Sequence, residues 1–103
     1  MKKFKIGAWI IGEPDNFPVK LLTLNMDGQG IESMGADGTR YKTDLNESDR
    51  KATPEEVGGA LTEAYIALAG NEHITEAHYD KKTDTLRIND VPVYKDGIHI
   101  AIL

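Results

Sequence analysis

The chain has 103 residues, of which 40 % are hydrophobic, and its 12 basic and 17 acidic residues give a formal net charge of −5. This size and composition are typical of one soluble globular domain, so we predict a single domain spanning residues 1–103. The sequence contains no cysteine, which excludes disulfide frameworks, thiolate metal sites and thiol nucleophiles.

The N-terminal region predicts neither secretion nor membrane insertion. The apolar run at residues 6–11 is too short for a signal sequence or a membrane span. The sequon Asn46-Glu47-Ser48 is therefore expected to be unused, because glycosylation requires the secretory pathway. We expect a cytoplasmic protein that makes no contact with membranes.

The first half of the chain is predicted to form a β-meander. Residues 3–11 alternate as a strand with residues 19–26 as its partner, and shorter strands follow at about 30–35 and 39–43. Three Asp-Gly pairs punctuate the β-type runs of the chain and favour primed turns, in which both central residues have positive φ: Asp27-Gly28, Asp37-Gly38 and Asp96-Gly97. Residues 44–53 are predicted to be a mobile loop.

One helix is predicted, at about residues 54–69. Thr53-Pro54-Glu55-Glu56 has the pattern of a capping box with proline in the first turn. Apolar residues then recur at helical spacing, and Gly70-Asn71 supplies a stop signal. The apolar stripe consists of Val57, Ala60, Leu61, Ala64 and Leu68.

The β pattern returns after the helix, with strands predicted at 73–80, 84–88, 91–94 and 98–103. Pro92 donates no main-chain hydrogen bond, so 91–94 is expected to be an edge strand or a bulge. The predicted fold is α+β. It has about seven or eight short strands in antiparallel meanders, arranged as a sandwich or partial barrel and packed on the single helix.

Two patterns resemble metal sites. Glu76, His78 and Asp80 would share one face of a strand, where two carboxylates and an imidazole suit a divalent cation. Oxygen-bearing side chains from Asp44 to Glu55 match part of a calcium-loop spacing but lack its glycine. We favour a solvated strand face for the first and a helix first-turn acid for Glu55. No cofactor is expected.

Catalytic motifs are missing from the sequence. It contains no Ser-His-Asp set, no phosphate-binding glycine loop and no His-Glu-x-x-His helix. His99 alternates with apolar residues, a pattern more typical of a hydrogen-bonded core histidine than of a ligand. We therefore expect a non-catalytic protein.

The outer face of the predicted helix is unusual because it combines Gly58, Gly59 and Thr62 with Ile66. Glycine inside a helix costs about 1 kcal/mol relative to alanine, but it lets another backbone approach closely. We predict that this face contacts another subunit or a partner protein. The alternatives are an irregular first turn or packing of the chain's own 44–53 loop.

Several predicted strands are apolar on both faces, including the one that carries Trp9 and Ile11. Such strands are covered on both sides. The cover is either the second meander or another molecule, for which Trp9, Phe17 and Tyr94 would be interface anchors. Ile11 is predicted to belong to the same interface.

Acidic residues concentrate at residues 44–84, where the net charge is −6. This charge argues against direct nucleic-acid binding, because phosphate would be repelled. We predict a protein-interaction module, either an inhibitor or adaptor of a larger macromolecule or a self-assembling homo-oligomer. The acids Glu47, Asp49 and Glu63 would meet a basic partner such as a nucleic-acid-handling enzyme. The alternatives are a ligand-binding or small enzyme domain with a pocket between helix and sheet, using His99, Tyr65 or Tyr94, and a component of a ring or virion-type assembly.

Overall fold

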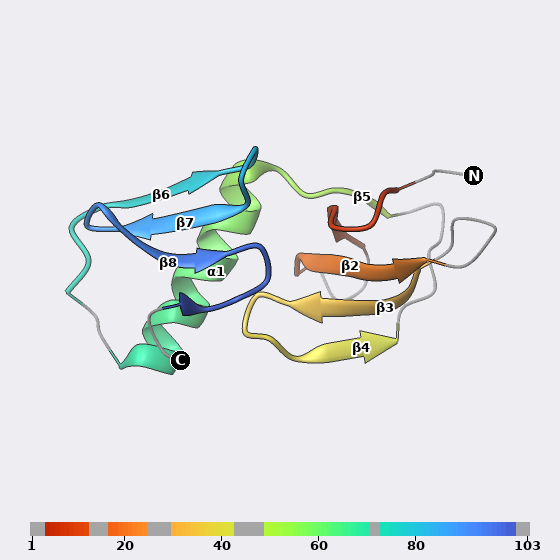
Figure 1. Ribbon diagram of the computed structural model, residues 1–103, viewed down its shortest axis with the longest axis horizontal. Coiled ribbons are helices and arrows are strands. Elements are labelled where there is room, and N and C mark those ends of the chain that lie inside the picture. The colour runs from red at the N-terminus through yellow and green to blue at the C-terminus, as the bar shows by residue number, and fades with distance from the viewer. Residues whose placement is uncertain (1–3, 13–16, 25–29, 43–48, 71–72, 101–103) are drawn as a thin grey trace. The chain divides into compact units, whose positions relative to one another are not determined.

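The computed structural model describes residues 4–12, 17–24, 30–42, 49–70 and 73–100 (Figure 1). Its described residues form eight strands in two antiparallel sheets and one helix, so the predicted α+β class is confirmed. The chain divides into two compact units, Met1–Ala52 and Thr53–Leu103. Each unit is described by itself.

The first unit contains a five-stranded antiparallel sheet with the order β4-β3-β2-β1-β5. Phe4, Ile10 and Leu21 form its buried cluster, with Ala8 and Val19 packed against it. The strands are β1 (Trp9–Ile11), β2 (Val19–Leu24), β3 (Gly30–Gly35), β4 (Arg40–Lys42) and β5 (Arg50–Lys51).

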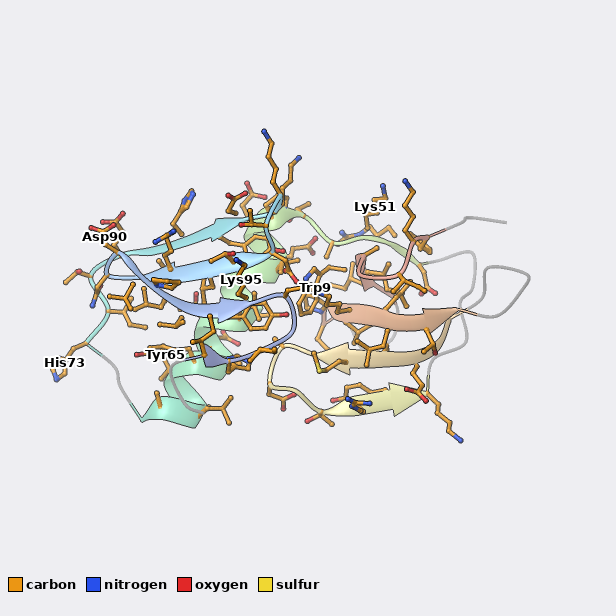
Figure 2. All side chains as sticks on the ribbon, in the orientation of Figure 1. Trp9, Lys51, Tyr65, His73, Asp90 and Lys95 are labelled. Atoms are coloured by element: carbon orange, nitrogen blue, oxygen red, sulfur yellow. The ribbon has the colours of Figure 1, made fainter. Side chains whose placement is uncertain are left out.

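Two predictions for this unit are wrong in detail. The strand predicted at 3–11 is regular only over β1, because Gly7 turns the chain with a φ of +90°. The main chain around this turn is held by hydrogen bonds from Gly7 N–H to the Leu21 carbonyl (2.7 Å) and from Leu21 N–H to the Ala8 carbonyl (2.9 Å). The segment 44–53 is not all loop, since β5 pairs with β1. β5 is short and polar, so no alternation indicates it; its Lys51 is labelled in Figure 2.

The Asp-Gly pairs do not all form the same turn. Asp96 and Gly97 both have positive φ, 47° and 90°, as a primed turn requires. At Asp37-Gly38 only the glycine has positive φ, and the Asp37 carboxylate accepts a hydrogen bond from Thr39 N–H at 2.9 Å. The hydrogen bond that the Asp37 carboxylate accepts favours a turn other than the primed type. Asp27-Gly28 lies outside the described residues.

The second unit begins with α1 (Pro54–Ala69), which has the predicted bounds. The Thr53 hydroxyl accepts from Glu56 N–H at 3.1 Å, and the Glu56 carboxylate accepts from Thr53 N–H at 2.9 Å, so the capping box is complete. Gly70 ends the helix in the left-handed conformation. Val57, Leu61 and Ala64 are buried, whereas Leu68, near the end of the helix, is 46 % exposed. No helix in the described part of the chain is long and apolar enough to cross a membrane.

Three antiparallel strands complete this unit in the order β6-β7-β8, and α1 packs against β6 and β7. The predicted strand at 98–103 is reduced to an isolated bridge between Lys95 and Ile98, and residues 101–103 lie outside the described part. The strands are β6 (Ala77–Asp80), β7 (Thr85–Ile88) and β8 (Val91–Lys95). Their buried apolar side chains are Leu86, Ile88, Val93 and Tyr94.

Candidate functional site: the groove between α1 and β6

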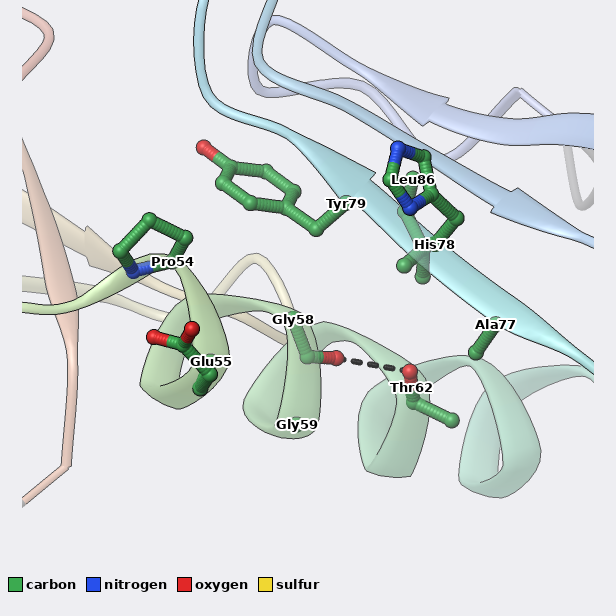
Figure 3. A pocket seen from close by; sticks show the side chains of 9 residues that line it. All are labelled: Pro54, Glu55, Gly58, Gly59, Thr62, Ala77, His78, Tyr79 and Leu86. Atoms are coloured by element: carbon green, nitrogen blue, oxygen red, sulfur yellow. Dashed lines mark hydrogen bonds between the residues drawn. The ribbon is translucent and has the colours of Figure 1, made fainter.

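An open groove of about 490 Å³ lies between α1 and the edge strand β6, within the second unit (Figure 3). Its helix wall comes from the first two and a half turns of α1, and its strand wall comes from β6 together with Leu86 of β7. The lining residues are Pro54, Glu55, Gly58, Gly59, Thr62, Ala77, His78, Tyr79 and Leu86.

Gly58 allows α1 and β6 to come close together. A Cβ atom built on Gly58 would lie 3.1 Å from the Tyr79 Cβ, closer than ordinary van der Waals contact. The close approach predicted for this glycine is therefore made within the unit, against β6. The predicted contact with a second molecule is not needed to explain Gly58.

Gly59 is different because no such contact exists for it. A Cβ atom on Gly59 would meet nothing within 4 Å, and the residue is exposed. The Thr62 hydroxyl, one turn further along the helix, donates a hydrogen bond to the Gly58 carbonyl at 2.7 Å. No side chain covers the helix at Gly59, so its backbone is accessible from the groove.

The strand wall presents Ala77 and Tyr79 toward the helix. Because side chains alternate along a strand, His78 does not share that face of β6, although it also lines the open groove (Figure 3). The Tyr79 hydroxyl donates to the Asp84 carboxylate at 2.6 Å, which orients the ring. β6 is at the edge of the sheet, so its outer side is not paired with another strand among the described residues.

The main-chain pairing of β6 indicates which groups face that outer side. Asn89 N–H donates to the Glu76 carbonyl at 2.9 Å, in the same register that pairs Ala77 with Ile88. Main-chain groups alternate in direction along an antiparallel strand. Those of Ala77 are therefore directed away from β7, toward the open edge.

The net negative charge of the chain belongs to the second unit. Residues 53–103 carry nine acids and four bases, whereas residues 1–52 carry eight of each. On α1 there are three acids and no base. Of these acids, Glu55 lines the groove and Glu63 lies one turn beyond Gly59; both are exposed.

The residues singled out as metal ligands are not drawn together. Glu76, His78 and Asp80 are all exposed, and no group of three or more His, Asp or Glu side chains in the described residues is arranged to hold a metal ion. Most of the calcium-loop pattern falls at 44–48, outside the described residues. Glu55 lies in the first turn of α1.

The predicted interface residues do not lie in one place. Gly58, Gly59 and Thr62 line the groove, Glu63 is exposed beside it, and Ile66 is half-buried. Phe17 is 39 % exposed and its ring lies 5.7 Å from that of Tyr41. Trp9, Ile11 and Asp49 are buried in the folded chain, and their place in an interface stays a prediction. Glu47 lies outside the described residues.

The polar residues predicted for a ligand pocket lie elsewhere in the second unit. His99 packs edge-on against Tyr94, with ring centroids 5.0 Å apart. Burial, reinforced by the nearby Asp84 carboxylate, raises the pKa of the Tyr94 hydroxyl well above its usual value. Tyr65 lies on α1 (Figure 2). None of these three residues is among those that line the groove.

Comparison with protein-family models, curated protein sequences and solved structures finds no match to this chain. The functional argument therefore depends on the groove itself. Sequence reasoning identified its helix wall through the two glycines but not its strand wall. The close contact of Gly58 with Tyr79 joins residues 21 positions apart, and no spacing rule predicts such a contact.

Proposed function

We propose that the chain is a non-catalytic protein-interaction module whose α1–β6 groove receives an extended segment of a partner protein. A groove between a helix and an edge strand is a common site for extended peptides, which pair with the strand and place alternate side chains against the helix. The outward main-chain groups of Ala77 are placed for such pairing.

The observation that carries this proposal is the exposed glycine in the helix wall. Gly59 costs the helix about 1 kcal/mol relative to alanine, and no contact within the described structure requires it. A second chain that approaches the helix backbone at this point would require it. Gly58 illustrates the same effect within the unit, because its missing side chain lets Tyr79 come close to the helix.

The chemistry of the lining also favours binding over catalysis. The Thr62 hydroxyl is engaged with a helix carbonyl and the Tyr79 hydroxyl with Asp84. Both hydroxyl groups of the lining therefore donate to acceptors within the chain, which supports binding over nucleophilic chemistry at these hydroxyls.

The charge of the second unit supports a basic partner. Its net charge of −5 would attract a basic surface and speed encounter with it. An inhibitor or adaptor that binds a nucleic-acid-handling enzyme belongs to this class.

The proposal is tested by selecting peptides from a random phage-displayed library on the immobilised full chain. Synthetic versions are then titrated into ¹⁵N-labelled protein. We expect saturable shifts of the Gly59, Thr62 and Ala77 amides, and weaker binding to Gly59→Ala by about fivefold or more, equivalent to about 1 kcal/mol. Selected peptides that shift only residues outside the groove, or failure to select any peptide, would contradict the proposal.

A second candidate function is small-molecule binding, which the groove volume favours because ligand sites commonly measure roughly 300–1,000 Å³. A fragment screen by NMR on the same labelled protein compares the two functions directly. Fragments that shift the groove amides when no peptide does would favour the small molecule. Self-assembly is measured separately by sedimentation across a concentration series.

A further inference from the structure

We infer that the groove selects an extended segment with two basic side chains four residues apart and a small residue midway between them. This inference rests on the proposed function and adds the chemistry of the partner. It comes from the placement of Glu55, Gly59 and Glu63 along one helix face.

The two carboxylates lie on either side of Gly59, each four residues away. Residues four apart share a helix face, so Glu55, Gly59 and Glu63 form a row. With a rise of about 1.5 Å per residue, the two glutamates are separated by about 12 Å along the axis. Both are exposed; Glu55 lines the groove, whereas Glu63 lies outside its lining, on the exposed helix surface that continues from Gly59.

An extended peptide has a matching repeat. Alternate residues of a strand project to the same side, and positions i and i+4 are about 13 Å apart. A chain lying along α1 would therefore bring one lysine or arginine to each carboxylate, with residue i+2 facing Gly59. Because Gly59 has no side chain, the peptide backbone can approach there if residue i+2 is glycine, alanine or serine.

The charges of the unit favour this partner over an anionic one. α1 has no basic residue, and the bases nearest to β6 along the chain, Lys81 and Lys82, lie in the turn that follows it. Phosphate groups of a nucleic acid or a membrane would be repelled by the glutamate row. The pattern reads the same in both directions, so charge alone does not set the direction of the bound segment.

The test uses three synthetic peptides titrated into the ¹⁵N-labelled full chain. The first, Thr-Lys-Thr-Ala-Thr-Lys-Thr, has lysines four apart. The second, Thr-Lys-Ala-Lys-Thr-Thr-Thr, has the same composition with lysines two apart, and the third replaces the central alanine of the first by leucine. We expect the first to bind about tenfold more tightly than the second. The second peptide can form only one of the two ion pairs, and its alanine no longer lies midway to face Gly59.

Matched variants test the protein side. Glu55→Gln combined with Glu63→Gln should weaken the first peptide about tenfold, because each exposed ion pair contributes up to about fivefold. Asp90→Asn serves as the control for lost negative charge, because Asp90 is an exposed acid in the turn between β7 and β8; it should change binding less than twofold.

Gly59→Ala separates binding from folding, since it should weaken the peptide while making the protein more stable. Equal affinity of the first two peptides, or equal effects of the glutamate and Asp90 variants, would overturn the inference. If library-selected peptides shift the groove amides but lack the basic pattern, only this inference is overturned. If no peptide shifts those amides, the proposed function fails with it.

Discussion

Replacing Gly58 and Gly59 by alanine, one at a time, compares two adjacent helical glycines in different surroundings. Alanine is favoured over glycine inside a helix by about 1 kcal/mol. At Gly59 the added methyl would meet nothing within 4 Å, so the full gain should appear. For a domain of 60–100 residues, 1 kcal/mol corresponds to a rise in Tm of about 4–8 °C.

At Gly58 the same gain is opposed by contact with β6. The methyl would lie 3.1 Å from the Tyr79 Cβ, which is attached directly to the backbone and cannot rotate away. α1 and β6 would have to separate by a few tenths of an ångström, which disturbs the packing over Leu86. We therefore expect Gly58→Ala to be no more stable than the parent protein.

The assay is urea denaturation followed by far-ultraviolet circular dichroism, with Tm measured on the same samples. The pair Glu63→Ala and Glu63→Gly calibrates the alanine–glycine difference at an exposed position of α1, because both variants lose the same charge. If this pair differs by about 1 kcal/mol and Gly59→Ala gains nothing, the reasoning about Gly59 is refuted. An equal gain from both glycine variants would refute the reasoning about Tyr79.

Three further outcomes are expected. Thr53→Ala should lower the free energy of unfolding by about 1 kcal/mol, because one arm of the capping box is lost; equal urea midpoints would contradict this. Asn89→Ala should cost about 1–2 kcal/mol, since the Asn89 carboxamide oxygen accepts hydrogen bonds from Thr75 N–H (2.9 Å), Thr75 Oγ1 (2.7 Å) and Glu76 N–H (3.1 Å), and Asn89→Asp, which keeps that acceptor, should cost less. Burial raises the pKa of Tyr94, so its folded state keeps a proton that the unfolded chain loses above about pH 10, and stability is complete below that pH and falls above it. Because phenylalanine does not ionise, the free energy of unfolding of Tyr94→Phe should fall by about 1.4 kcal/mol less at pH 11 than that of the parent protein. Parallel profiles of stability against pH for the two proteins, measured in urea, would exclude the effect.

Local interactions explain why some features could be predicted from the sequence. Thr53 and Glu56 are three residues apart, so the start of α1 depends only on its own turn, and Gly70 ends it in the same local way. Asp96 and Gly97 form the expected primed turn because their own φ preferences set it. The buried face of α1 at Val57, Leu61 and Ala64 follows from helical spacing.

The features that the sequence could not determine depend on which segments meet. Arg50 and Lys51 form a strand only because β1 offers an edge for pairing. Burial of Asp49 is likewise a property of the folded chain, since its type and position in a charged run indicate exposure. A charged run in the sequence therefore does not identify the surface charges.

The net charge is the clearest example of this division. Composition alone determines a net charge of −5, and counting along the chain assigns all of it to the second unit. Only the tertiary structure shows that Glu55 lines a groove whose other wall is β6, and that Glu63 is exposed on the same helix. The residues of β6 lie about 20 positions away from those of the helix wall. The distance between α1 and β6 is set by packing of Tyr79 against Gly58. The local conformational preference of neither residue predicts this contact.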